Sequence, residues 1–170
     1  MSDFESKNLS CRDCIGNCCT FTSNSMMISP IEALDILEYL KQKDSFSTKD
    51  LIFKLESTIN EYRLDSNTGI RKTYTCPFYK GEKKGCTISK HSKPFGCLAF
   101  LPNEENITQG KSCSSKINSL KDRDEKFKTN EQLVNEAIKN ELNLDWKKLS
   151  IPEAVLDLIK KGEHLLSHNS

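Results

Sequence analysis

The sequence has few of the residues and patterns that mark nucleotide-binding and membrane proteins. Its 170 residues contain only seven glycines, and these never form the G-x-G-x-x-G turn of a dinucleotide-binding site. No apolar stretch approaches the ~18 residues of a transmembrane helix. Basic and acidic residues are nearly balanced, 25 against 24, so the whole chain has no strong attraction for nucleic acid or anionic lipid. We therefore expect no dinucleotide site, no membrane partner and no general nucleic-acid partner.

The first residues, Met-Ser-Asp-Phe-Glu-Ser-Lys-Asn, contain no basic stretch, apolar stretch or small-residue cleavage site typical of a secretory signal. We therefore expect a cytoplasmic protein, in which thiols are kept reduced. The chain nevertheless contains eight cysteines. Clustered cysteines in a reducing compartment indicate metal binding more strongly than a disulfide framework.

The cysteines form two groups that lie far apart along the chain. The first is a C-x-x-C pair followed by two adjacent cysteines: Cys11, Cys14, Cys18 and Cys19. The second is spread over a turn-rich stretch: Cys76, Cys86, Cys97 and Cys113. A C-x-x-C loop offers two thiolates to one ion at ~2.3 Å and leaves the coordination half complete, so the other ligands must come from elsewhere. We predict a metal site built from all eight cysteines and from both groups.

Several features of this site stay open at the level of sequence. Four thiolates suit Zn²⁺ and an iron–sulfur cluster alike, and eight suffice for two sites or for one site with spare thiols. Adjacent residues of an extended chain point to opposite sides, so one of Cys18 and Cys19 is expected to face another site or to be a packed or reactive thiol. The competing interpretations are buried free thiols, a disulfide framework, and a redox pair at Cys11 and Cys14. His91 is a further candidate ligand, although a solvent-facing loop position suits it better.

Apolar spacing and capping residues predict four helices. They span about 30–42, 49–64, 131–142 and a last helix from 151 onward. Ser29 with Glu32, and Ser150 with Glu153, have the spacing of a capping box. Residues 116–128 read as a charged connector or a polar helix, and 70–74 and 87–89 as two short strands of a hairpin. The apolar side of the third helix is expected on Leu133, Val134, Ala137, Ile138 and Leu142.

Charge is unevenly distributed along the chain. Residues 66–116, which contain the second cysteine group, carry nine basic and three acidic side chains. Nearby lysines and arginines lower thiol pKa values and would favour thiolates and an anionic cluster. A solvated loop surface rich in lysine explains the same composition, and the two interpretations are compatible.

The cysteines and their neighbours resemble a bacterial cysteine-cluster family named for its C-x-x-C-x-x-C-C motif and described as chelating zinc or iron. The resemblance covers residues 10–115. It rests on the first cysteine group and on three later pieces: Cys76-Pro77-Phe78, Gly85-Cys86-Thr87-Ile88, and Lys93-Pro94-Phe95-Gly96-Cys97. The chain departs from the family pattern in the three-residue gap before Cys18, and in Ser89, Lys93 and Leu98, where the family has tyrosine or arginine. The resemblance implies metal chelation.

Together these observations predict one small domain spanning residues 1–170. It would be mainly α-helical, with irregular cysteine-rich loops and a short β-hairpin, organised by metal. Residues 10–115 would form the metal-binding region and 116–170 a C-terminal helical extension. The expected function is metal binding with a structural, carrier or interaction role. An iron–sulfur enzyme or electron-transfer accessory protein is one alternative and a nucleic-acid-binding zinc module another, but no nucleophile–base pair or nucleotide loop specifies an enzyme.

Overall fold

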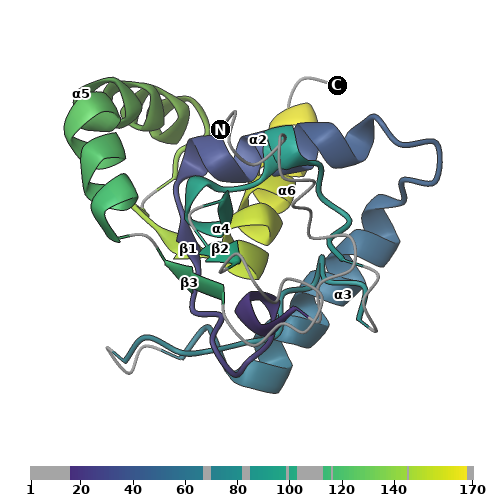
Figure 1. Cartoon of the computed structure of the whole chain (residues 1–170). Helices are drawn as coiled ribbons and strands as arrows, with labels where there is room; N and C mark the ends of the chain where they lie inside the picture. Colours follow the sequence, from purple (N-terminus) through teal and green to yellow (C-terminus); the bar gives the residue numbers. More distant parts are fainter. Residues whose placement is uncertain are drawn as a thin grey trace.

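The computed structural model of the chain describes residues 16–66, 70–81, 85–98, 100–102, 113–115, 117–144 and 146–167. These residues form a mainly helical structure, as the sequence predicts (Figure 1). The helices are α2 (Pro30–Lys41), α3 (Thr48–Tyr62), the short α4 (Phe95–Leu98), α5 (Ile117–Glu141) and α6 (Ile151–Ser167). None of the helices in these ranges combines the length and the hydropathy needed to cross a bilayer.

The apolar core lies where α6 packs against both α2 and α3. Its fully buried side chains include Ile36 of α2, Leu55 of α3 and Val155 of α6. The apolar spacing that predicts a helix over 49–64 corresponds to the buried side of α3, where Leu51, Leu55 and Ile59 are buried. Burial of such side chains is the main favourable term in folding. The C-terminal helix therefore contributes directly to the core rather than only extending it.

A two-stranded antiparallel ribbon lies at the N-terminal ends of α2 and α6. Strand β1 (Met27–Ile28) pairs with β4 (Leu149–Ser150), and each strand runs directly into its helix. The predicted cap of α2 is present, because the Ser29 N–H donates to Glu32 Oε2 at 2.9 Å. At α6 the Ser150 N–H donates to Glu153 Oε2 at 3.3 Å. These contacts satisfy backbone donors that would have no partner within the helix.

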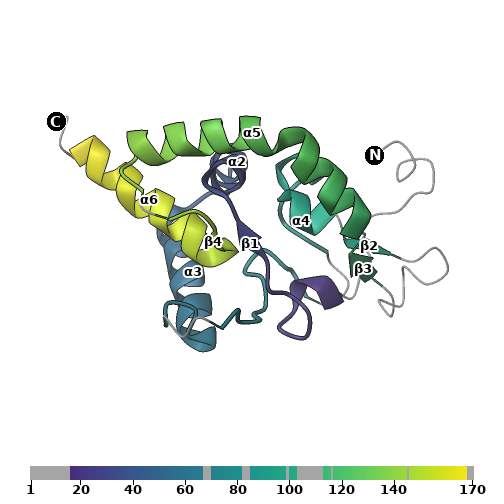
Figure 2. The ribbon, with the colours of Figure 1, turned by 90° about the vertical axis from the view of Figure 1, so that its left-hand side faces the viewer.

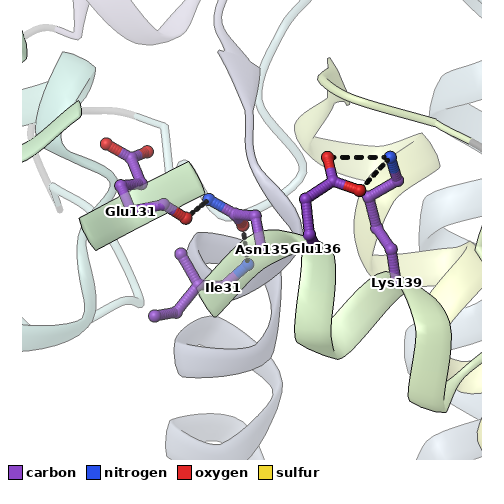
Figure 3. Close-up of polar contacts among 5 residues, drawn as sticks. All are labelled: Ile31, Glu131, Asn135, Glu136 and Lys139. Carbon is purple, nitrogen blue, oxygen red and sulfur yellow. Dashed lines mark hydrogen bonds and ion pairs between the residues drawn. The ribbon is translucent and has the colours of Figure 1, made fainter. Parts of the chain in front are cut away.

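Residues 117–141 form one helix, α5, which crosses over the start of α2 (Figure 2). Asn135 fixes this crossing: its Oδ1 accepts from the Ile31 N–H at 2.9 Å, and its Nδ2 donates to the Glu131 carbonyl at 2.7 Å (Figure 3). The predicted apolar side of this helix is partly wrong. Ile138 packs on the core, but Leu133 and Val134 are 66% and 42% exposed, because α5 contacts the body through the Asn135 side.

The predicted strands at 70–74 and 87–89 are wrong: both stretches are irregular in the structure. Among the described residues of 70–81 and 85–89, the strand-like pairing is an isolated bridge between Tyr79 and Cys86. A short hairpin of the predicted kind lies later, where β2 (Phe100–Pro102) pairs with β3 (Cys113–Ser115). Tyr74 and Phe78 are buried as single side chains and not as one face of a strand, and Ile70 is exposed.

Candidate metal centre

Five of the eight predicted ligands have described side chains. Cys18 and Cys19 lie in the 3-10 turn η2 (Asn17–Cys19), and Cys97 lies in α4. Cys76 ends an extended stretch, and Cys86 sits at the isolated bridge. All five are free thiols, so a disulfide framework is excluded for these positions. Cys11 and Cys14 lie outside the described residues, and only the backbone of Cys113 lies within them.

The two cysteine groups meet through their backbones. The Cys76 N–H donates to the Cys19 carbonyl at 2.7 Å. One residue earlier, Thr75 Oγ1 accepts from the Phe21 N–H at 3.2 Å and from the Tyr62 hydroxyl of α3 at 2.9 Å. The N-terminal segment and the Cys76 segment therefore lie side by side on α3, as expected for a centre that draws on both groups.

Gly16 and Tyr79 pack closely at the same junction. Gly16 has φ +75°, and a Cβ at this position would overlap the Tyr79 ring. Only glycine adopts this backbone conformation at little cost and leaves room for the ring. Tyr79 is also linked to Cys76, because its N–H donates to the Cys76 carbonyl at 3.0 Å.

Cys86 lies on a segment that pairs with the Cys76 segment through the backbone. The Lys80 N–H donates to the Gly85 carbonyl at 2.9 Å, and the Thr87 N–H donates to the Phe78 carbonyl at 2.8 Å. Lys43, just beyond α2, holds the residue that follows Cys86, because its Nζ donates to the Thr87 carbonyl at 2.9 Å. The position of Cys86 relative to Cys76 is thus set by backbone pairing, and its position on the body by Lys43.

Cys97 is held on the start of α2. The Phe95 N–H donates at 2.9 Å to Oε1 of Glu32, the same carboxylate that caps α2 through its other oxygen. The Cys97 N–H closes the turn by donating to the Pro94 carbonyl at 2.9 Å. Gly96 lies so close to Met26 that a Cβ there would overlap the Met26 sulfur, so α4 is pressed against the chain just before β1.

The thiols of these segments are close enough for their charges to interact. Burial raises the pKa of Cys97 well above its ordinary value, and neighbouring Cys76, Cys86 and Cys18 raise it further. Burial raises the pKa of Cys76 to about 12, against the opposing effect of a hydrogen bond from the Phe78 backbone. A hydrogen bond with Cys19 is the largest cause of the raised pKa of Cys18, ahead of burial. Four cysteines from three segments therefore share one largely apolar environment.

The donor chemistry of this cluster suits a soft or borderline cation. Thiolate sulfur is the ligand that zinc and iron–sulfur clusters prefer. A backbone N–H that donates to the sulfur helps to orient such a ligand, and the Phe78 backbone makes this hydrogen bond to Cys76. Within the described ranges, no three His, Cys, Asp or Glu side chains already stand as a group that could hold a metal ion. His91, in the turn η3 (Lys90–Ser92), is exposed.

A separate hollow of about 500 Å³ lies between α3 and α6. Carboxylates and Trp146 line it, and Trp146 Nε1 donates to Asp157 Oδ2 at 2.6 Å. An exposed ion pair between Lys160 Nζ and Glu56 Oε1, 2.9 Å apart, lies at its wall. None of its lining residues is a cysteine or a histidine, so this hollow does not belong to the thiol cluster.

The residues that position the cysteines carry no local signal of that role in the sequence. Glu32 is predictable as a cap of α2, but its second bond, to Phe95, depends on where α4 lies. Lys43, Tyr62 and Tyr74 are indistinguishable in sequence from other surface or core residues. Their roles are set by contacts between segments that are distant in the chain, for which one sequence contains no local pattern.

A family model matches residues 10–114 of the chain, which is more than half of it. The model is CxxCxxCC, described as a "putative zinc- or iron-chelating domain". No curated protein and no solved structure shows significant similarity to the chain. The matched range contains all eight cysteines, including the five whose side chains are described above.

Proposed function

Because this chain belongs to the CxxCxxCC family of zinc- or iron-chelating domains, we propose that it holds Zn²⁺ or an iron–sulfur cluster through thiolates of both cysteine groups. The proposal rests above all on one observation. The Cys76 N–H donates to the Cys19 carbonyl at 2.7 Å, so the backbone brings the two cysteine groups together. The raised pKa values of Cys76 and Cys97 agree with this, since the thiols of Cys18 and Cys86 contribute to both.

The four interacting thiols are the ligand set that we place first. The other predicted ligands, Cys11, Cys14, Cys19 and Cys113, would complete this site or form a second one. Thiols with raised pKa values stay protonated at neutral pH, so binding a cation requires these protons to leave. The bound cation would then offset the repulsion between the thiolates, draw the sulfurs toward one centre and link the segments that carry them.

The role that we favour is structural. The cysteine segments contain turns and short elements, and the 70–98 stretch has only a few large buried side chains, such as Tyr74 and Phe78. A metal bound by residues on three such segments would replace part of the apolar burial that they lack. In a carrier or interaction role, the metal or the surface around it would instead be offered to a partner.

Metal analysis of anaerobically purified protein tests the proposal. We expect either a colourless protein with stoichiometric zinc or a brown protein with stoichiometric iron and sulfide. Cys76→Ser and Cys97→Ser should each lower the metal content. Ala154→Ser is the matched control, because it also places a hydroxyl at a buried position but lies in α6. The proposal would be wrong if the wild type held no metal after reconstitution, or if both cysteine variants kept the full content.

A chelator competition separates a structural role from a carrier role. For a structural metal we expect slow release, with loss of amide protection in residues 70–98 while the helical circular dichroism persists. Fast release with protection unchanged would overturn the structural role and favour a carrier. The same measurement on the Ala154→Ser variant shows whether a general loss of stability can imitate either result.

A further inference from the structure

Tyr74 lies two residues before Cys76 and is fully buried. Its hydroxyl makes two hydrogen bonds to backbone groups of other segments. It donates to the Met26 carbonyl at 2.6 Å and accepts from the Ile151 N–H at 3.0 Å. The hydroxyl therefore joins the chain before β1 to the first residue of α6.

These two partners are the next pair in the register of the β1–β4 ribbon. Met27 pairs with Ser150, so Met26 and Ile151 follow one position further along. Ile151 is the first residue of α6, and its N–H has no partner within the helix. The Tyr74 hydroxyl thus bridges the next residue pair of the ribbon. It also gives a hydrogen-bond partner to the backbone N–H at the start of α6.

The backbone of Tyr74 is fixed just as firmly. Its N–H donates to the Asn24 carbonyl at 2.9 Å, and its carbonyl accepts from Asn24 Nδ2 at 3.0 Å. Asn24 is itself buried, and its Oδ1 accepts from the Met26 N–H at 3.1 Å. Two residues after Tyr74, the Cys76 N–H donates to the Cys19 carbonyl. A short, fully hydrogen-bonded stretch therefore joins a proposed ligand to the start of α6.

We propose that Tyr74 is a positioning residue that couples metal loading of the cysteine cluster to the docking of α6. This inference rests on the proposed function. The hydroxyl contacts favour the arrangement in which Cys76 lies beside Cys18 and Cys19. Coupling between two sites is reciprocal, so a metal that requires this arrangement stabilises the Tyr74 contact with Ile151 to the same degree.

The test compares the wild type with Tyr74→Phe, which keeps the ring and removes both hydroxyl contacts. Zn²⁺ serves as the probe, with affinity measured by chelator competition and amide exchange followed at Ile151. Zn²⁺ should slow exchange at Ile151 in the wild type. In the variant, this slowing should be lost, and affinity should fall roughly three- to tenfold at unchanged stoichiometry, as expected for losing one or two hydrogen bonds. Tyr39→Phe, which removes a hydroxyl on α2, should behave as the wild type.

The outcomes separate the two proposals. A wild type that binds no Zn²⁺ would overturn the proposed function and this inference together. A wild type that binds Zn²⁺ with no change in exchange at Ile151 would overturn the inference alone, even if the variant failed to fold. Equal Zn²⁺ affinity in the wild type and Tyr74→Phe would also overturn it, because Tyr74 would then stabilise the fold without acting on the cluster.

Discussion

The helical half of the molecule and its cysteine half are stabilised in different ways. The helical half comprises β1, α2, α3, β4 and α6, and its core positions are close to fully buried, with Ala33, Leu55 and Val155 at 0% exposure. The cysteine half comprises residues 16–24, 70–81 and 85–98. It consists mostly of turns, with α4 as its longest regular element.

The cysteine half is attached to the helical half by a few buried side chains, such as Tyr74 and Phe78, and by polar side chains. Glu32 holds the Cys97 segment, Lys43 holds the Cys86 segment, and Tyr62 holds the Cys76 segment. Each of these side chains comes from α2, α3 or the turn between them and reaches a polar group of the cysteine half. Single hydrogen bonds contribute about 1 kcal/mol each, much less than a buried apolar helix face. The metal cross-link that we propose would therefore add stability mainly to the cysteine half.

The largest effect is expected from the helical half. Leu55→Ala should lower the free energy of unfolding by about 2–5 kcal/mol, because it leaves a cavity between α3 and α6. Phe53→Ala in the same helix is the control. Phe53 is 76% exposed, and the change should stay within about 0.5 kcal/mol. Urea unfolding measures both, and similar losses in the two variants would contradict this account of the core.

A pair of glycines probes the cysteine half. Gly16 and Gly81 have similar φ values, +75° and +70°, but a Cβ at Gly81 would meet nothing within 4 Å. Gly81→Ala should cost about 1–2 kcal/mol for the left-handed backbone alone. Gly16→Ala should cost about 1–3 kcal/mol more, because the Tyr79 ring must move. Equal losses in urea unfolding would show that the Gly16–Tyr79 contact is unimportant.

Glu32→Gln tests the connection between the halves. A glutamine has one acceptor oxygen and can still cap α2, so the bond to the Phe95 N–H should be lost at a cost of about 1 kcal/mol. Glu153→Gln is the matched control, since Glu153 Oε2 alone serves the cap of α6. We expect faster amide exchange at Phe95 and Cys97 in the first variant only. The prediction fails if both variants leave this exchange unchanged.

The smallest effect is expected at the surface of α2. Burial raises the pKa of Asp35, and the charges of Glu38 and Glu32 add to the rise. The ionised form is therefore less favourable in the folded than in the unfolded state, and its cost is present at pH values above the folded pKa. Asp35→Asn should raise stability at pH 7, by about 0.5 kcal/mol or less for this exposed residue.

The gain from Asp35→Asn should disappear as pH falls below the ordinary aspartate pKa, because both states are then protonated. Thermal unfolding at pH 7 and at pH 3 measures the difference. A gain of equal size at both pH values would show that the substitution acts through helix propensity and not through charge.

Local patterns in the sequence were sufficient to predict most of the helical half. Ser29 with Glu32 and Ser150 with Glu153 correctly mark where α2 and α6 begin, because a cap involves residues only three positions apart. The stripe of Leu51, Leu55 and Ile59 correctly identifies the buried side of α3. Predictions failed where the outcome depends on distant partners. The strands at 70–74 and 87–89 did not form, and Leu133 and Val134 face outward because α5 lies on α2 through Asn135.

Local patterns along the chain are enough to identify the chemistry of this protein: eight thiols in two groups, the family to which their spacing belongs, and the starts of its main helices. Which of the segments that carry these thiols meet, and what holds them there, depends on the tertiary fold. The Cys76–Cys19 and Phe95–Glu32 hydrogen bonds join residues far apart in the chain. Such contacts depend on how the helices pack, and their geometry is therefore a property of the whole fold.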